Sequence, residues 1–419
     1  MLTVNRIRLS AATWSLLLGG SLLAGAPAAG ARHAEAFVRG SACTPHQALA
    51  TWSLRRLAWQ TVVVPAQETD VAAVGGPVAA GAGGVILFGN HAPADLGAQL
   101  RRLTSRAPHG IRPFVMTDEE GGSVQRMANL VGSIPSARTM GATMTARRIQ
   151  QLARRVGGRM AAAGITMDLA PVLDLDAGPG PNADNPIGTR SFSGRASVAS
   201  RDGLAFARGL SDSGVVPVVK HFPGLGGATG NTDLHAASTK PWAALQKHGL
   251  KPFEAAVRAG VPVVMTSNAR VPGLSAAPAS LSHAVTKNVL RRKLGFNGLV
   301  ITDALSAGAI VEAGYRVPGA TVRALRVGAD MVLFNAASGD VGSVATATVH
   351  AVVASAHAGS LPRRRLETAV LHGLTARGVD PCARTGSVRT PAARAADRAS
   401  ARPGPARRAG SPAGRRTPR

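Results

Sequence analysis

Short apolar runs alternate along the chain with longer stretches of helical periodicity, from about residue 61 to residue 335. The apolar runs are rich in Val, Ile and Leu and are continuous, as in parallel strands that are buried on both faces. Each run is followed by polar or glycine-rich residues, where a loop is expected. We predict eight strands, at residues 61–66, 84–89, 113–118, 166–174, 215–220, 261–267, 298–303 and 329–335.

Stretches with amphipathic helical spacing lie between these strands. Residues 146–164 place Ile149, Val156 and Met160 on one face, and residues 242–259 and 283–294 show the same spacing. Eight strand–helix repeats predict one α/β domain, a (β/α)₈ barrel of the TIM type, over residues 44–382. An open, doubly wound parallel sheet is the alternative that this pattern leaves open.

The N-terminal residues 1–32 have the order of segments found in a signal peptide. Arg6 and Arg8 precede an apolar run at about residues 11–24, and small residues dominate positions 25–30. A membrane anchor is the alternative, but the run is short of the roughly 20 residues that a span needs. We therefore expect a protein that is secreted or associated with the cell envelope and has no transmembrane span after processing.

Residues 383–419 carry ten arginines and only one aspartate, so this short segment supplies a large part of the net charge of +26. This tail is also rich in Pro, Ala, Gly and Ser, so we predict that it is disordered. It is either a solvated, dispensable segment or a means of electrostatic association with an anionic cell envelope. No nucleic-acid recognition motif accompanies the charge, so a nucleic-acid partner is not expected.

The two cysteines, Cys43 and Cys382, stand at the two ends of the predicted domain. In an exported protein such a pair indicates a disulfide bond, and a barrel brings its chain ends close together. Two unrelated free thiols are the alternative.

Polar residues follow several of the predicted strands, at the edge where a barrel carries its active site. They are Asn90, His91, Asp118 to Gly122, Asp174, Asp176, Lys220, His221, Ser267, Asn268 and Asp303. Asp303 either caps a helix that begins at Ala304 or is a catalytic carboxylate. Farther along the glycine-rich loop after Lys220, Asp233 and His235 have the spacing that lets a carboxylate orient an imidazole as a proton donor.

Motifs of several other enzyme classes are absent from the sequence. It has no His-Glu-x-x-His or compact cysteine motif for zinc, and no dinucleotide fingerprint after the first strand. A Gly-x-Ser-x-Gly nucleophile elbow is also missing. We expect neither a metal nor a cofactor.

Five ordered segments resemble glycoside hydrolase family 3, and within it the single-domain β-N-acetylhexosaminidases. They are Thr-Asp-Glu-Glu-Gly-Gly-Ser-Val-Gln-Arg at 117–126, Leu-Ala-Pro-Val-Leu-Asp at 169–174, Ile-Gly-Thr-Arg-Ser-Phe at 187–192, Lys-His-Phe-Pro-Gly at 220–224, and residues 278–303, which open with Pro-Ala-Ser-Leu-Ser and end in Ile-Thr-Asp. The resemblance covers roughly residues 51–378 and implies a barrel.

The resemblance also implies an exo-acting, retaining hydrolase of terminal β-linked N-acetylhexosamine, N-acetylglucosamine above all, with peptidoglycan fragments as one source of substrate. It makes Asp303 the nucleophile that forms a covalent glycosyl–enzyme intermediate, and His235, oriented by Asp233, the general acid/base. It makes five further residues ligands of the sugar hydroxyls: Asp118, Arg126, Arg190, Lys220 and His221.

Two positions of the loop after Lys220 depart from the family's common form. Leu225 stands where the family usually has His, and Gly227 where it usually has Asp. The altered loop leaves a sugar-binding barrel without activity as one alternative. The resemblance to the family as a whole leaves two more, a β-glucosidase and a glycoside phosphorylase.

Overall fold

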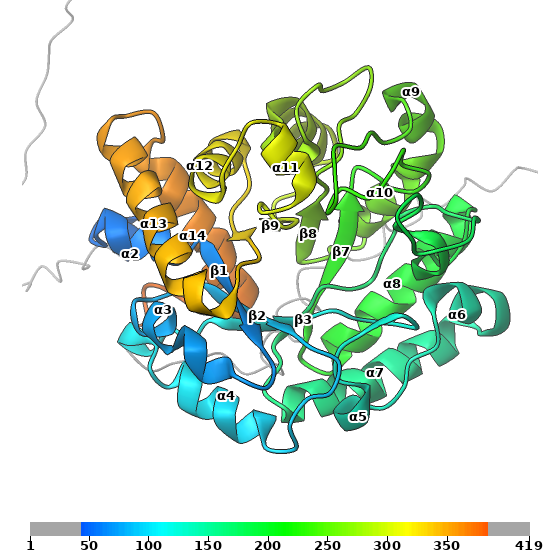
Figure 1. Cartoon of the computed structure of the whole chain (residues 1–419), viewed down its shortest axis with the longest axis horizontal. Coiled ribbons are helices and arrows are strands. Elements are labelled where there is room, and N and C mark those ends of the chain that lie inside the picture. The colour runs from blue at the N-terminus through cyan, green and yellow to red at the C-terminus, as the bar shows by residue number, and fades with distance from the viewer. Residues whose placement is uncertain (1–42, 384–419) are drawn as a thin grey trace, which may run out of the picture. The chain divides into compact units, whose positions relative to one another are not determined.

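Eight parallel strands form the centre of the molecule, and helices surround them (Figure 1). The computed structural model describes residues 43–383. Around the sheet the order is β10-β1-β2-β3-β6-β7-β8-β9, and a parallel bridge between Ile301 and Met331 joins the two ends of this order into a ring. The strands are β1 (Val62–Gln67), β2 (Gly84–Phe88), β3 (Phe114–Thr117), β6 (Met167–Asp168), β7 (Val216–Phe222), β8 (Val263–Thr266), β9 (Leu299–Thr302) and β10 (Val332–Leu333).

The barrel prediction is confirmed, and each of the eight predicted strands overlaps one observed strand. The fourth is much shorter than the predicted range 166–174. Pro171 has no N–H to give to a ladder, and pairing beyond Asp168 is reduced to one isolated bridge between Val172 and Lys220. One feature was not predicted: a short antiparallel hairpin of β4 (Glu119–Gly121) and β5 (Val124–Gln125) directly after β3.

The helices fill the intervals between strands. The α-helices are α1 (Pro45–Ala50), α2 (Leu54–Trp59), α3 (Gly75–Ala79), α4 (Leu96–Thr104), α5 (Ala128–Val131), α6 (Ala137–Thr143), α7 (Ala146–Ala162), α8 (Ala196–Asp212), α9 (Trp242–Ala244), α10 (Lys251–Arg258), α11 (Gly308–Glu312), α12 (Val317–Val327), α13 (Val341–His357) and α14 (Arg363–Arg377). Short 3₁₀ turns are η1 (Val71–Val74), η2 (Pro108–Gly110), η3 (Gly188–Arg190), η5 (Ala279–Leu281) and η7 (Ser338–Asp340). Two segments wind as π-helix, η4 (Leu245–Gly249) and η6 (Ala284–Lys293). The predicted helix 242–259 is therefore three joined segments, α9, η4 and α10.

Aliphatic and methionine side chains, with Phe114, fill the inside of the barrel, in keeping with the low aromatic content of 3% of the chain. Val63, Ile86, Met116, Val218 and Ile301 belong to this inner cluster and are fully buried. Strand residues of the opposite parity pack outward against the helices. The barrel interior is thus a packed core, and a ligand can enter only at its ends.

The chain ends of the domain are joined by a disulfide bond between Cys43 and Cys382, which confirms that prediction. It links the segment before α1 to the segment after α14, across a sequence separation of 339 residues. Arg363 at the start of α14 also donates to the carbonyls of Leu49 and Ala50 at the end of α1. The predicted signal peptide and all but the first residue of the predicted tail lie outside the described residues. No helix within residues 43–383 is long and apolar enough to cross a membrane.

Candidate active site

Lys220, near the end of β7, lies between two carboxylates at the mouth of the barrel. Its Nζ is 2.6 Å from Asp118 Oδ1, just after β3, and 2.6 Å from Glu120 Oε1 in the hairpin. The ammonium is almost completely buried. Burial alone would lower the pKa of Lys220, but the charges of Asp118 and Glu120 outweigh it and raise the pKa. Lys220 therefore stays charged and fixes both carboxylates.

Arg190, which ends η3, forms a bidentate ion pair with Glu120. Its Nε and Nη2 each lie 2.8 Å from an oxygen of Glu120, and Nη1 donates to the carbonyl of Pro186. Burial opposes ionisation of Glu120, but Arg190 and Lys220 together lower its pKa below the usual range. Arg126 completes this group, with Nη2 at 4.0 Å from Asp118 Oδ2.

His221 is oriented by a buried carboxylate that sequence reasoning did not assign to the site. Nδ1 of His221 lies 2.6 Å from Asp174 Oδ2, and Asp174 also accepts from the backbone N–H groups of His221 and Leu225. A carboxylate at Nδ1 favours the tautomer that keeps the proton there and leaves Nε2 to a ligand. Two signals in the sequence pointed to Asp174: its position at the end of a predicted strand and its place in the family-like segment 169–174.

Glu119 and Asp168 form a buried carboxyl layer beneath these residues. The N–H of Glu119 donates to Asp168 Oδ1 at 3.0 Å, and Glu119 Oε1 accepts from the N–H groups of Arg126 and Met127, both at 2.7 Å. Burial raises the pKa of Glu119 to about 7 and that of Asp168 well above its usual value. Glu119 thus holds the hairpin that presents Glu120 and Arg126.

Asp303 follows β9 directly, at the same rim. Its backbone N–H donates to the carbonyl of Thr266 on β8, and its Oδ1 accepts from the N–H of Ala304 at 2.7 Å. Among residues 43–383, no hydrogen bond uses Oδ2. Helix α11 begins only at Gly308, so Asp303 does not cap a helix, and the capping alternative is wrong.

The segment that contains Asp233 and His235 is docked on the loop after Asp303. The N–H groups of Gly308 and Ala309 donate to the carbonyls of Asp233 and Thr232, at 2.9 and 3.0 Å. Asp233 is exposed as a residue, but desolvation of its carboxyl by the surrounding barrel mouth and the nearby charge of Asp303 raise the pKa of Asp233 to about 6. His235 is exposed, and its Nδ1 lies 3.1 Å from the carbonyl of Ala236. Within the described residues no hydrogen bond joins Asp233 to His235, so the structure does not pair them.

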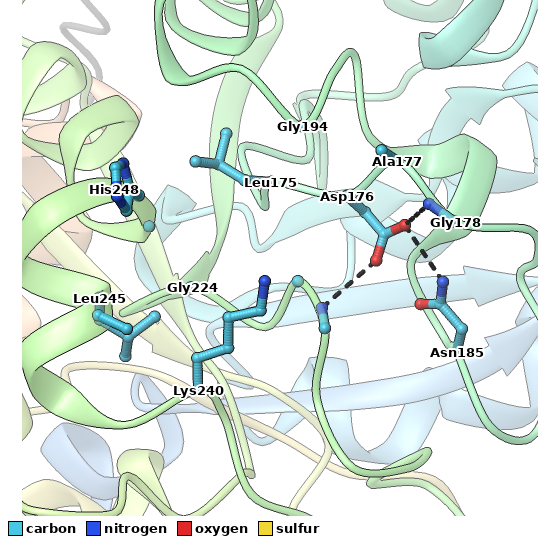
Figure 2. Close-up of a pocket in the computed structure, with 14 residues that line it drawn as sticks. Leu175, Asp176, Ala177, Gly178, Asn185, Gly194, Gly224, Lys240, Leu245 and His248 are labelled. Atoms are coloured by element: carbon cyan, nitrogen blue, oxygen red, sulfur yellow. Dashed lines mark hydrogen bonds between the residues drawn. The ribbon is translucent and has the colours of Figure 1, made fainter.

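A cavity of about 620 Å³ lies beside this rim, between the loops that follow β6 and β7. Asp176 and Asn185 lie on one side of it and His248 on the other (Figure 2). Lys240 also lines the cavity, beside Gly227, one position where this chain departs from the family pattern. Gly227 has a φ of 68°, in the left-handed region that favours glycine.

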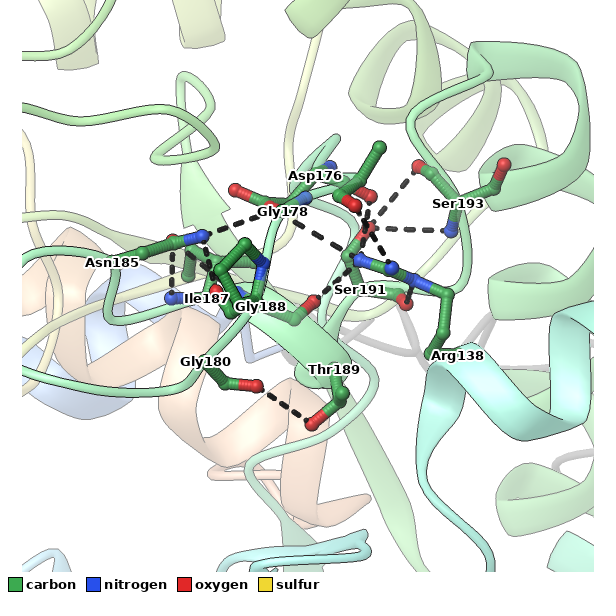
Figure 3. A network of polar contacts seen from close by, with 12 residues as sticks. Arg138, Asp176, Gly178, Gly180, Asn185, Ile187, Gly188, Thr189, Ser191 and Ser193 are labelled. Carbon is green, nitrogen blue, oxygen red and sulfur yellow. Dashed lines mark hydrogen bonds and ion pairs between the residues drawn. The ribbon is translucent and has the colours of Figure 1, made fainter.

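Arg138, in α6, anchors the long loop that carries Arg190. Its guanidinium donates to the carbonyls of Asp176 and Gly188 at 2.9 Å, and to two further carbonyls of the loop (Figure 3). Ser191 Oγ adds a bond of 2.6 Å to the carbonyl of Asp174. These bonds give the loop between β6 and α8 a defined conformation around Arg190.

Comparison with known proteins agrees with this geometry. Residues 78–376 match the description Glycosyl hydrolase family 3 N terminal domain. The chain belongs to glycosyl hydrolase family 3. As a family member with a (β/α)₈ barrel it is a glycoside hydrolase, and its substrate is a carbohydrate.

Relatives within the family carry more specific descriptions. The chain is 37% identical to a protein of Mycobacterium tuberculosis described as beta-hexosaminidase LpqI, over 64% of this chain and 68% of that one. It is 35% identical to an uncharacterized secreted glycosyl hydrolase of Arthroderma benhamiae, over 67% of this chain and 80% of the relative. The crystal structure of a beta-N-acetylhexosaminidase from Beutenbergia cavernae superposes with a TM-score of 0.71 at 33% identity, covering 79% of this chain and all of that one.

Of the eight residues that the sequence predicts for the site, the structure gathers five at the rim: Asp118, Arg126, Arg190, Lys220 and His221. Asp303 follows β9 at the same rim, and the turn with Asp233 and His235 is hydrogen-bonded to the loop after Asp303. No group of three or more His, Cys, Asp or Glu side chains within residues 43–383 is arranged to hold a metal ion.

Proposed function

We propose that the protein is an exo-acting β-N-acetylhexosaminidase that removes terminal N-acetylglucosamine with retention of configuration. The observation that carries this proposal is the charge-locked group of Asp118, Lys220, Glu120 and Arg190 at the rim that also holds Asp303. Fixed charged donors and acceptors at a barrel mouth suit the hydroxyls of one sugar ring, and two relatives in the family are described as hexosaminidases.

Each member of the group has a distinct part in holding the sugar. Asp118 accepts hydrogen bonds from hydroxyls, while Lys220, Arg126 and Arg190 supply donors whose own positions are fixed by carboxylates. His221 offers Nε2, because Asp174 occupies Nδ1. Since these partners are already paired before a ligand arrives, little conformational entropy is lost on binding.

Asp303 is the nucleophile in this proposal. One of its carboxylate oxygens attacks C1 of the sugar, the bond from C1 to the glycosidic oxygen breaks, and the departing oxygen takes a proton from His235, the general acid/base, with Asp233 as its partner. Water then attacks C1, gives a proton back to His235, and the bond to Asp303 breaks. The bond that Ala304 gives to Oδ1 holds the carboxylate in one orientation for this attack.

The test is hydrolysis of an aryl N-acetyl-β-glucosaminide by the wild type and by Asp303→Ala. We expect the variant to lose on the order of 10⁴-fold or more in kcat, because the covalent step has no substitute. The matching aryl β-glucoside is the comparison substrate, and we expect it to turn over much more slowly. Unchanged turnover by Asp303→Ala, binding without turnover by the wild type, a preference for the glucoside, or a rate that rises with added phosphate would each overturn part of the proposal.

We also propose that the protein acts outside the cell or on its envelope, with fragments of peptidoglycan as substrate. The signal-peptide pattern, the disulfide bond and the description of one relative as secreted support this location. We further propose that the basic tail associates electrostatically with anionic envelope polymers. Full-length protein should then sediment with isolated cell walls at low ionic strength and be released at high salt. Sedimentation that is insensitive to salt would exclude an electrostatic association.

A further inference from the structure

We propose that a strip of exposed arginines on helices α4 and α7, separate from the basic tail, is a docking surface for a linear polyanion with phosphodiester links. The arginine strip consists of Arg101, Arg102, Arg147, Arg148, Arg154 and Arg155. None of these residues belongs to the group at the barrel mouth. The inference therefore goes beyond the proposed sugar-cleaving activity and assigns the folded domain a second surface.

Helix α7 supplies four members of the strip. Its apolar face packs into the domain core, and Arg147, Arg148, Arg154 and Arg155 are exposed on the side that faces solvent. The first and third of these are seven residues apart, as are the second and fourth. Seven residues are about two helical turns, or about 10.5 Å along the axis. The four guanidinium groups thus follow the helix axis in two steps.

Helix α4 extends the strip at the C-terminal end of α7. A Cβ at Gly97 would lie 3.4 Å from Arg101 Nη1 and 3.5 Å from the carbonyl oxygen of Ala162, so Arg101 lies beside the last residues of α7. Arg102 is exposed next to it. Both helices belong to the outer wall of the barrel (Figure 1). A polymer bound along this wall leaves the barrel mouth open.

The positive charge of the strip is not compensated by carboxylates of the domain. Helix α7 contains no Asp or Glu in 17 residues. Within residues 43–383, none of the six arginines forms an ion pair or a side-chain hydrogen bond. Two carboxylates at the edges of the strip, Asp95 and Asp212, accept instead from Gln99 and Gln150, both at 2.8 Å. The strip is therefore a region of positive potential that attracts anions.

This charge arrangement does not favour the helix that carries it. Arg147 and Arg148 lie in the first turn of α7, which has no acidic residue, although the helix dipole disfavours cations there. Arg155 and Arg159 are four residues apart, a spacing at which like charges repel. A polyanion bound to the strip would remove both unfavourable terms. The arginines are thus better explained by a ligand than by the stability of α7.

The side chains of the strip favour an extended phosphodiester polymer over other polyanions. Guanidinium groups bind phosphate oxygens with two parallel hydrogen bonds. An anionic bilayer is usually bound by basic residues together with large apolar ones, but the exposed large hydrophobic residues of 43–383 are Leu234 and Val311, outside the strip. Single-stranded nucleic acid is usually bound by aromatic residues that stack on its bases, and α4 and α7 contain none.

The experiment measures binding of the full-length protein to fluorescently labelled poly(glycerol phosphate) by anisotropy at several salt concentrations. The strip variant combines Arg147→Gln, Arg148→Gln, Arg154→Gln and Arg155→Gln. We expect it to bind about 10- to 100-fold more weakly at low salt, and the slope of log K against log salt to become smaller by about 3, because four contacts are lost. Its Tm should not fall, since the changes remove repulsion within α7.

Two further variants separate the strip from net charge and from the tail. The matched control carries Lys247→Gln, Arg258→Gln, Arg292→Gln and Arg326→Gln, which remove four exposed cations from other helices, and we expect its affinity to change less than about threefold. In the other variant the ten arginines of residues 384–419 are replaced by Gln. Adding the strip changes to that variant should lower its remaining affinity by the same factor as in the wild type.

Hydrolysis of the aryl N-acetyl-β-glucosaminide and a thermal melt, both expected to be unchanged, establish that each variant is folded. Equal losses in the strip variant and the matched control would reduce the effect to net charge and overturn the proposal. So would an unchanged affinity when the strip changes are added to the chain with the neutral tail. Tighter binding to phosphatidylglycerol vesicles or to single-stranded DNA than to poly(glycerol phosphate) would overturn the choice of partner. Because the probe is not a glycoside substrate, these results do not depend on the proposed function.

Discussion

Replacing Gly308 with Ala tests how far activity depends on the contact between the two loops of the active site. A Cβ at this position would lie 2.2 Å from the carbonyl oxygen of Leu234 and 2.9 Å from the N–H of His235, and both are backbone atoms. Contacts below 3.0 Å require a shift, so the turn must move away by about 1 Å. The hydrogen bond from Gly308 to the carbonyl of Asp233 would weaken with it.

We expect this displacement to lower both turnover and stability. The loss of one or two backbone hydrogen bonds in a surface turn amounts to about 1–3 kcal/mol. A misplacement of about 1 Å at an acid/base costs on the order of 10²-fold in rate. The loss should appear in kcat/KM for a poor leaving group, with KM little changed, because the charge-locked group around Lys220 is untouched.

The assay is steady-state hydrolysis of two aryl N-acetyl-β-glucosaminides, one with a dinitrophenyl leaving group, which departs without a proton, and one with a methylphenyl leaving group, which needs one. A thermal melt of each variant accompanies it. Gly158→Ala in α7 is the matched control, since a Cβ there meets nothing within 4 Å. Full activity of Gly308→Ala on the methylphenyl substrate would show that the docking of the two loops is not needed for proton transfer.

Three further predictions concern the parts of the fold that support the site. Arg138→Lys should raise KM severalfold with little change in Tm, because a lysine cannot donate to four carbonyls of the loop at once. Glu119→Gln should flatten the pH dependence of stability: the raised pKa means that its contribution is full below about pH 4.5 and falls by up to about 3 kcal/mol as the pH approaches 7, as chemical denaturation at several pH values would measure. Asp330→Ala should lower the free energy of unfolding by about 3–5 kcal/mol in a urea titration, because it leaves Arg291 and Arg365 buried without their shared carboxylate.

For each of these three predictions there is an outcome that would contradict it, and two of them have a control variant. Arg155→Lys, on the exposed face of α7, should leave KM unchanged, and an equal effect of both arginine variants would remove the anchoring role. A parallel pH dependence of Glu119→Gln and the wild type would mean that Glu119 is ionised in the folded protein at low pH. Asp340→Ala, at an exposed site, should cost little, and a cost for Asp330→Ala as small as that would refute the buried-charge argument.

The repeating pattern of apolar runs determined the barrel, because a parallel strand buried on both faces needs continuous apolar residues wherever it occurs. The same pattern placed Asp303, Lys220 and His221 on the rim, whereas their roles in catalysis and sugar binding were implied by the resemblance to the family. The cysteine pair followed from its position at the two ends of the domain. Periodicity, strand ends and the positions of the cysteines can all be read directly from the sequence.

Only the tertiary structure decided which rim residues meet. Glu120 and Asp174 proved to be the carboxylates that hold Arg190, Lys220 and His221, and a linear sequence contains no measure of such distances. The pairing of Asp233 with His235 was inferred from their spacing, but the fold instead seats the turn on Gly308, since backbone hydrogen bonds between distant loops are invisible to spacing. The sequence gives the type of each side chain, whereas the charged neighbours of that side chain are determined only when distant segments meet in the folded structure.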